Sequence, residues 1–223
     1  CRAAVAAMSG RIPKPLQAAL AAMIASMGAG GGVYLAEQER TSQLQTEYLQ
    51  TVAADTSTSD AIKLAMVLGS YYESSFRHIG TPYVDKLGKG QPLTVCNGIT
   101  GAGVVAGRYY TPADCYKLEV GRYREAEAFL AKSVPTYSAA TVLQQATFLY
   151  FVHNVGSAGF SGSTMRRKLL AGDVVGACRE NSRWVYGTIN GAKVALPGLV
   201  IRRNANSDLC DGTERIEGMV FDG

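Results

Sequence analysis

Hydrophobic and polar positions along this chain predict a mostly helical protein. From residue 60 to about residue 72, apolar side chains recur every three or four positions, as in a helix that buries one face. Serine and threonine residues at 56–59 are suited to cap the first turn of this helix, and Glu73 falls at its end. The preceding segment, 36–55, is polar and helix-prone, so we expect it to form a connecting helix.

The pattern after this helix is typical of a short β-hairpin. Glycine, proline and polar residues are frequent in 80–92, and a short run of strand-forming residues lies on each side of the turn. Asp85 falls on the first predicted strand and Thr94 on the second. Because successive side chains point to opposite faces of a strand, we expect Thr94 and Cys96 on one face and Val95 on the other.

The rest of the chain predicts further helices. Thr111, Pro112 and Asp114 combine a capping side chain, a proline at the first helical position and an acid in the first turn, which is typical of a helix start. We expect this helix to end near Lys132. The other helices predicted are 138–153, capped by Ser138 and expected to be the most buried, then 163–170, 173–186 and 196–210.

The N-terminal region is uncharged without being strongly hydrophobic. Residues 15–36 contain no charged side chain. As a helix they would span about 33 Å, at ~1.5 Å per residue, which is about the thickness of a bilayer core. Half of them are Ala or Gly, whose transfer into lipid is much less favourable than that of Leu or Ile. Basic residues precede the segment, so the positive-inside rule places the N-terminus in the cytoplasm.

Four interpretations of this segment are open. It is a cleaved signal peptide, a permanent anchor, a segment that inserts and later leaves the membrane, or an Ala-rich helix buried in the domain. The marginal hydrophobicity favours the third. We therefore assign residues 1–36 to a weakly hydrophobic signal-anchor segment, and residues 37–59 to the connecting helix and a linker.

Charge and residue spacing exclude several classes of function. The net charge is +4, but residues 1–36 hold three basic side chains and no acid, so the rest of the chain is nearly balanced. This distribution indicates a targeting segment rather than a nucleic-acid-binding surface, and we interpret Arg202 and Arg203 as a solvated helix face. The two histidines lack the spacing of a zinc site or a Ser–His–Asp triad, so neither a metal nor another cofactor is expected.

Several motifs together resemble one known family. A glutamate at a helix end (Glu73), an aspartate (Asp85), a glycine-containing turn and the sequence Thr-Val-Cys-Asn-Gly-Ile-Thr-Gly at 94–101 resemble the active-site hairpin of the phage-type lysozymes, glycoside hydrolase family 24. Three later segments resemble that family in the same order, and the match covers about residues 60–211. They are 151–160, 169–184 and 196–210.

The resemblance implies a fold class and a catalytic site. The fold is α+β and lysozyme-like, mostly helical, with a small β-hairpin lobe beside the active-site cleft and a polar tail at 212–223. Glu73 is implied as the general acid and Asp85 as the base or electrostatic carboxylate, while Thr94 orients the attacking water. Neighbouring aromatic side chains would partly desolvate Glu73 and favour its protonated form; they are Tyr71, Tyr72 and Phe76.

Other residues are implied in lesser roles. Asn154 and Arg183 are implied as sugar contacts, with helix capping and a surface ion pair as the respective alternatives. This chain also departs from the family, because eleven residues separate Glu73 from Asp85 and eight separate Asp85 from Thr94, so each loop is longer than usual. The longer loops bear on the exact placement of Asp85 and Thr94.

The cysteines fit an exported, oxidised domain. There are five and none lies in a Cys-x-x-Cys motif, which disfavours metal binding. The chain itself leaves their pairing open. The resemblance implies the pairs Cys96–Cys115 and Cys178–Cys210, which leaves Cys1 over, and a thiol-triggered switch involving Cys1 is an alternative use of it.

The resemblance also implies a biological role. The chain would hydrolyse the β-1,4 bond between N-acetylmuramic acid and N-acetylglucosamine of bacterial peptidoglycan, for host cell lysis. It would be exported to the host periplasm, anchored transiently in the inner membrane by residues 15–36, and monomeric once released. Two alternatives stay open: an inactive lysozyme-like module that binds peptidoglycan, and a membrane-permeabilising protein that acts through residues 15–36.

Overall fold

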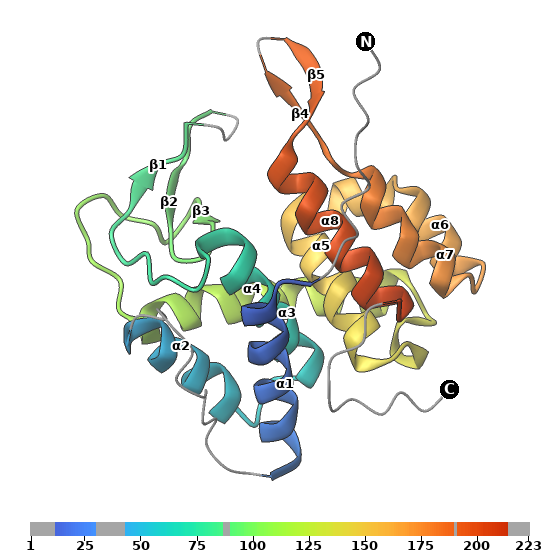
Figure 1. The fold of residues 1–223 in the computed structure, drawn as a ribbon. Coiled ribbons are helices and arrows are strands. Elements are labelled where there is room, and N and C mark those ends of the chain that lie inside the picture. Colours follow the sequence, from blue (N-terminus) through green and yellow to red (C-terminus); the bar gives the residue numbers. More distant parts are fainter. Residues whose placement is uncertain (1–11, 30–42, 87–89, 190, 214–223) are drawn as a thin grey trace.

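A computed structural model of the chain describes residues 12–29, 43–86, 90–189 and 191–213 (Figure 1). Its elements in chain order are α1 (Lys14–Ala29), α2 (Gln43–Ala54), α3 (Asp60–Ser74), β1 (Tyr83–Val84), β2 (Leu93–Val95), β3 (Ile99–Thr100), α4 (Pro112–Ser133), η1 (Tyr137–Ala139), α5 (Val142–Ser161), α6 (Thr164–Leu170), α7 (Val174–Arg179), η2 (Glu180–Arg183), β4 (Tyr186–Ile189), β5 (Ala192–Ala195) and α8 (Pro197–Asp211).

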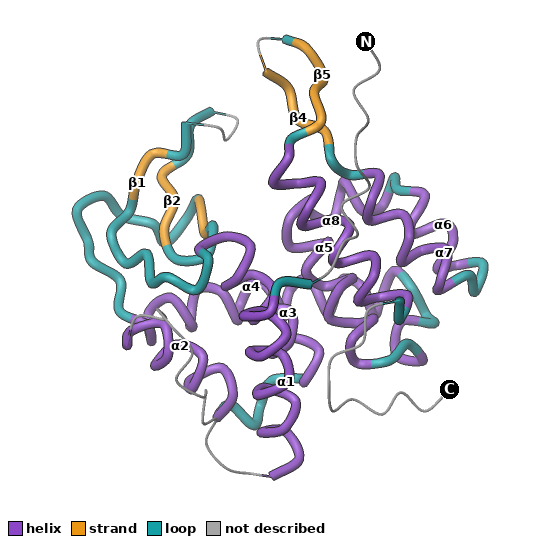
Figure 2. Tube along the Cα trace, viewed as in Figure 1, coloured by secondary structure: helices purple, strands orange, loops and turns teal. Residues whose placement is uncertain are grey.

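The elements form a small sheet region and a larger helical region. β1, β2 and β3 make an antiparallel sheet in that order, with Tyr83 paired to Thr94 and Val95 paired to Ile99. Figure 1 shows this sheet on one side and α5 to α8 on the other, with α3 and α4 between them. Within the described residues, the strands are confined to this sheet and to a second hairpin, β4–β5 (Figure 2). The prediction of a mostly helical α+β fold with a small β lobe is confirmed.

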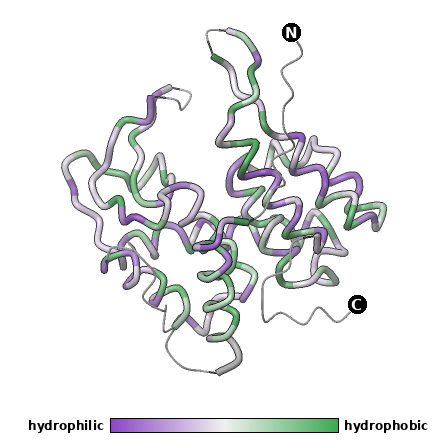
Figure 3. Tube along the Cα trace, viewed as in Figure 1, coloured by the Kyte–Doolittle hydropathy of each residue, from purple (hydrophilic) through white to green (hydrophobic). Residues whose placement is uncertain are grey.

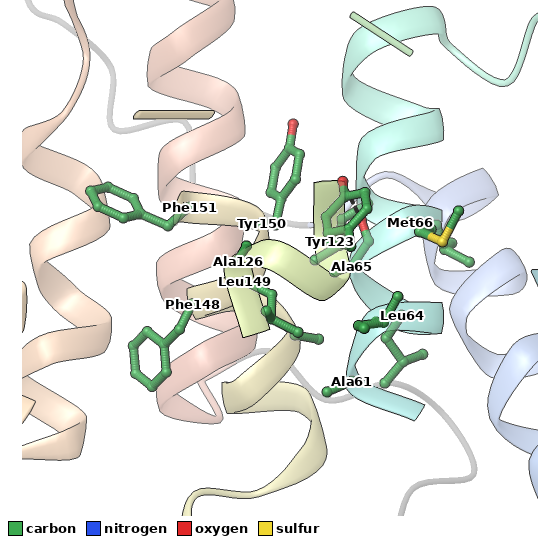
Figure 4. Close-up of a cluster of buried hydrophobic side chains, with 14 of the residues drawn as sticks. Ala61, Leu64, Ala65, Met66, Tyr123, Ala126, Phe148, Leu149, Tyr150 and Phe151 are labelled. Carbon is green, nitrogen blue, oxygen red and sulfur yellow. Dashed lines mark hydrogen bonds between the residues drawn. The ribbon is translucent and has the colours of Figure 1, made fainter. Parts of the chain in front are cut away.

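Helix α3 lies at the centre of the core. The side chain of Ser59 accepts a hydrogen bond from the Ile62 amide and so starts the helix. Tyr123 of α4 lies between α3 and α5 (Figure 4), and its hydroxyl donates to the carbonyl of Ala65. Gly69 permits this approach, because a Cβ atom there would lie 2.7 Å from the Tyr123 hydroxyl oxygen. Close packing around α3 therefore fixes the direction in which its last turn points.

Helix α1 packs against α3 as part of the same core. Many of its residues are coloured as hydrophobic in Figure 3, and the most buried of them include Leu16, Leu20 and Met23. The helix covers part of the expected signal-anchor segment, and residues 30–36 lie outside the described part of the chain. None of the helices in the described ranges has the length and apolar character needed to span a bilayer.

Several predicted boundaries are wrong for local reasons. The strand does not continue to Cys96, because that residue adopts a left-handed φ of 56° and the chain turns there. Ser138 lies in η1, and Thr141 caps α5 instead, through a capping box with Gln144. Helix α5 breaks at Gly156, whose dihedral angles are non-helical (φ 74°, ψ 163°), close to the predicted end near 153, and a further helical stretch then runs to Ser161.

The predicted helix 173–186 is also shorter than expected. In its place the chain forms two short helices, α7 and η2. The hairpin β4–β5 follows them and extends away from the helices (Figure 1). The sequence contains a signal for this hairpin that the prediction missed. The dipeptide Asn-Gly at 190–191, between two runs of strand-forming residues, is typical of a tight hairpin turn.

Two disulfide bonds join neighbouring elements. Cys96, after β2, is bonded to Cys115 of α4, and Cys178 of α7 is bonded to Cys210 of α8. These are the two pairs that the resemblance implied. Cys1 lies outside the described residues.

The second disulfide should contribute measurably to stability. It closes a loop of 32 residues, and such bonds typically stabilise a fold by about 2–4 kcal/mol. The double variant Cys178→Ala/Cys210→Ala should therefore unfold at lower urea concentration than the parent. In excess reductant the difference should shrink, because the parent then loses the same bond. Equal midpoints under oxidising conditions would contradict this prediction.

Candidate active site

Glu73 lies in the last turn of α3, where the helix meets both regions of the molecule. The helix ends because Ser75 and Phe76 adopt left-handed φ values of 52° and 57°, which few residues other than glycine favour. The Glu73 side chain is 22% exposed, so it is partly buried but still accessible from solvent. A partly exposed carboxyl at a helix end is suited to act on a bound molecule.

Two side chains of the helical region hold the Glu73 carboxyl. Nη1 of Arg202 lies 2.7 Å from Oε1 of Glu73, and Nη2 lies 3.2 Å from Oε2. The hydroxyl of Tyr150, on α5, donates to the same Oε1 at 2.9 Å. Both oxygens of Glu73 are thus oriented by donors from α5 and α8.

Arg202 is itself held in place by neighbouring groups. Its guanidinium donates to the carbonyl of Tyr72 at 3.0 Å and to the side-chain oxygen of Asn154 at 2.8 Å. The Asn154 amide in turn donates to the carbonyl of Tyr150 at 2.9 Å. The planar guanidinium bridges three acceptors at once, which a lysine ammonium would do less well.

The interpretation of Arg202 and Arg203 as a solvated helix face is therefore wrong. Arg202 pairs with Glu73, and Arg203 is buried with its guanidinium 5.2 Å from the centre of the Phe151 ring. Burial lowers the pKa of Arg203 to about 10. Both arginines face inward because α8 packs against α5.

The sheet region approaches Glu73 from the other side. Gly98, in the turn between β2 and β3, has a φ of 83°, and a Cβ atom there would lie 3.8 Å from the Glu73 carboxyl. Thr94 is buried on β2, opposite Tyr83, and its hydroxyl donates to the carbonyl of Pro92 at 3.2 Å. The Thr94 hydroxyl is therefore engaged by the backbone at the start of its own strand.

Asp85 lies directly after β1 rather than within it. Its amide donates to the carbonyl of Pro92 at 2.9 Å, so the backbone pairing continues through this residue. The pKa of the Tyr83 hydroxyl is raised by partial burial and, to a lesser extent, by the negative charges of Asp85 and Glu73. Both carboxyls are thus close enough to Tyr83 for their charges to act on it.

The other predicted site residues have different surroundings. Asn154 belongs to the Arg202 network, whereas Arg183 forms an ion pair with Glu180 at 3.4 Å and its side chain is 70% exposed. The groups around the Glu73 carboxyl also differ in part from the aromatic residues that were expected there. Tyr71 packs edge to face against Tyr72 and against Phe76, whereas Tyr150 and Arg202 contact the carboxyl.

A second carboxyl, on Glu119 of α4, is fully buried behind the turn. Burial raises its pKa to about 7, although hydrogen bonds from Tyr48 and Asn97 act in the opposite direction. No local pattern in the sequence predicted a role for this residue. Glu119 lies one helical turn after Cys115, on the face of α4 that the disulfide to Cys96 joins to the sheet region. This spacing is a signal that could have identified the residue.

The raised pKa of Glu119 predicts a pH dependence of stability. Between about pH 4.5 and pH 7 the folded chain keeps a proton that the unfolded chain releases, so the free energy of unfolding should fall as the pH rises through this range. The variant Glu119→Gln should lack this part of the slope. Urea unfolding of both proteins at pH 5, 6, 7 and 8 measures the difference, and parallel curves would contradict the prediction.

Known proteins share sequence with this chain. Residues 78–206 match the family described as phage lysozyme, a range that contains Asp85, Thr94 and Arg202 and begins after Glu73. A SAR-endolysin of Bacteriophage PS119 is 34% identical over 133 residues, which are 58% of this chain and 72% of that protein.

Solved structures with the same fold agree with this match. The muramidase domain of SpmX from Asticaccaulis excentricus aligns with a TM-score of 0.57 at 20% identity, over 65% of this chain and 92% of that one. The active form of the P1 phage endolysin Lyz aligns with a TM-score of 0.55 at 20% identity, over 87% of this chain and 94% of that one. The lysozyme-like fold predicted for this chain is confirmed.

Proposed function

This chain belongs to the phage lysozyme family and is a glycoside hydrolase of the lysozyme type, and from that premise we propose its reaction. We propose that it is an endolysin that hydrolyses the β-1,4 bond between N-acetylmuramic acid and N-acetylglucosamine of bacterial peptidoglycan. The observation that carries the proposal is the placement of Glu73, a partly exposed carboxyl that is held by Arg202 of the helical region and lies beside the Gly98 turn of the sheet region.

In the proposed mechanism Glu73 is the general acid. It protonates the glycosidic oxygen as the bond to the anomeric carbon breaks, and the negative charge of Asp85 stabilises the positive charge that develops on the sugar ring. Thr94 orients the water whose oxygen bonds to the anomeric carbon, and the proton that this water loses is taken up by a carboxylate of the site. Tyr150 and Arg202 fix the orientation of both oxygens of Glu73 before substrate binds, and one of these contacts has to open for the carboxyl to carry the proton that it transfers.

Arg202 shapes how Glu73 acts. As long as the guanidinium pairs with both carboxyl oxygens, the Glu73 carboxyl lies next to a positive charge and both of its oxygens are occupied. We propose that the bound sugar chain takes over one of these contacts and that Asn154 holds Arg202 while this happens. Asn154 and the exposed Arg183 are also proposed as sugar contacts at the edge of the site.

Purified cell wall tests the proposed function directly. The full chain, freed of detergent, should release soluble fragments from isolated peptidoglycan sacculi, which contain no membrane. A protein that only binds peptidoglycan would sediment with the sacculi without dissolving them, and a membrane-permeabilising protein would neither bind nor dissolve them. Either result would overturn the proposal.

We further propose that the chain is exported to the host periplasm and is held transiently at the inner membrane by residues 15–36. The packing of Leu16, Leu20 and Met23 against α3 supports release, since it gives this segment an apolar site in the folded domain once it leaves the lipid. Fractionation of host cells before and after membrane depolarisation tests this. A chain that stays in the membrane fraction throughout, or that is already shortened, would contradict release.

A further inference from the structure

The turn at residues 96–98 lies beside Glu73. Cys96 and Gly98 both have left-handed backbone angles, with φ of 56° and 83°, and the Cys96 amide donates to the carbonyl of Ile79 at 2.8 Å. Because Gly98 lies close to the Glu73 side chain, with room between them for little more than a Cβ atom, a movement of this turn would alter the space around the carboxyl. What fixes the turn therefore matters for the site.

Glu119 fixes the middle residue of the turn. Its Oε1 accepts from the Asn97 amide at 3.1 Å, and its two oxygens accept from the Asn97 side-chain nitrogen at 3.1 Å and 3.0 Å. Glu119 is 1% exposed and Asn97 is 6% exposed. One buried carboxyl thus holds both the backbone and the side chain of Asn97.

Helix α2 contributes to the same buried network. The hydroxyl of Tyr48 donates to Oε2 of Glu119. The Ser70 hydroxyl, on α3 and one turn before Glu73, accepts from Gln45 of α2 at 3.1 Å and from Asn97 at 3.2 Å. Side chains of α2, α3 and α4 therefore converge on one residue of the turn.

This arrangement does more than fill the core. A buried carboxyl costs free energy unless donors surround it, and well-packed apolar residues would stabilise the same contact between helices equally well. In this network, however, the donors from Asn97 all come from the turn that lies beside Glu73. The network therefore fixes the orientation of this turn and does not only fill buried space.

We infer that Glu119 is a positioning residue for catalysis. Because Tyr48 donates to Glu119, the packing of α2 also contributes to the geometry of the active site. The inference rests on the proposed function of Glu73. Glu119 does not touch the substrate in this account. It holds the 96–98 turn at one position beside Glu73, so loss of either partner should lower kcat and leave KM little changed.

A pair of matched variants tests this inference. Tyr48→Phe removes one hydroxyl that donates to a carboxylate across the contact between α2 and α4. Tyr116→Phe removes another, which donates to Asp55 just after α2, away from the turn. On labelled sacculi, Tyr48→Phe should lower kcat about tenfold, since small displacements at an active site cost rate steeply. Tyr116→Phe should keep the parent kcat.

Two further measurements separate the possible failures. Glu119→Gln should also lower kcat, and adding Tyr48→Phe to it should lower kcat little further, because both changes act through one carboxyl. If Glu73→Gln is inactive while Tyr48→Phe has the parent kcat, or if Tyr48→Phe and Tyr116→Phe lose activity equally, the positioning role is wrong and the proposed function stands. If Glu73→Gln keeps its activity, the proposed function is wrong and this inference is wrong with it.

Discussion

The variant Glu73→Gln should lose nearly all hydrolysis of peptidoglycan while keeping its fold. Glutamine has the shape of glutamate, and its one carbonyl oxygen can still accept from Tyr150 and from Nη1 of Arg202, although its amide nitrogen then faces Nη2; it has no acidic proton to give to a leaving oxygen. General acid catalysis typically contributes about 10²- to 10⁴-fold, so kcat should fall by a factor in that range. Initial rates of fragment release from labelled sacculi measure the loss.

A matched change elsewhere serves as the control. Glu125 of α4 has a side chain that is 75% exposed and pairs only loosely with Arg122 at 3.9 Å. The variant Glu125→Gln removes the same charge from the chain and should keep the parent rate. If both variants lost activity to the same extent, net charge rather than a proton from Glu73 would explain the effect.

The second large effect is expected at Arg202. Arg202→Lys keeps a positive charge, but one ammonium cannot bridge Glu73, Asn154 and the Tyr72 carbonyl together. We expect kcat to fall by roughly 10- to 100-fold, because the Glu73 carboxyl loses its fixed orientation. Stability should fall by about 1–3 kcal/mol, since buried acceptors are left without donors.

Arg179 provides the control for this prediction. It also pairs with an acid from another element, Asp211 at 3.2 Å, but its side chain is 68% exposed. Ion pairs at the surface typically contribute about 0–1 kcal/mol, so Arg179→Lys should change neither rate nor stability appreciably. Equal behaviour of the two lysine variants would show that Arg202 has no special place at the site.

Local sequence signals predicted the elements that carry the acid. The apolar periodicity before Glu73 and the serine cap at its start correspond to α3, and Thr111 with Asp114 forms the capping box that starts α4. These signals act within a few residues, so a single sequence suffices to recognise them. The end of α3 at Glu73 and the hairpin after it follow from the same local chemistry.

The partners of Glu73 could not be predicted in this way. Arg202 lies 129 residues further along the chain and Tyr150 lies 77 residues further, and each reaches Glu73 only because α5 packs against both α3 and α8. An arginine pair on a helix is more often solvated than paired. The Glu119 network was missed for the same reason, since Tyr48, Asn97 and Glu119 meet only in the folded chain.

The new reducing ends on digested sacculi test the central claim most directly. Parent protein and Glu73→Gln are incubated with the same sacculi, the products are reduced with borohydride, and the terminal sugars are assigned by mass spectrometry. We expect reduced N-acetylmuramic acid ends with the parent and almost none with the variant. Reduced N-acetylglucosamine ends, non-reducible anhydro ends, or equal yields from both proteins would contradict it.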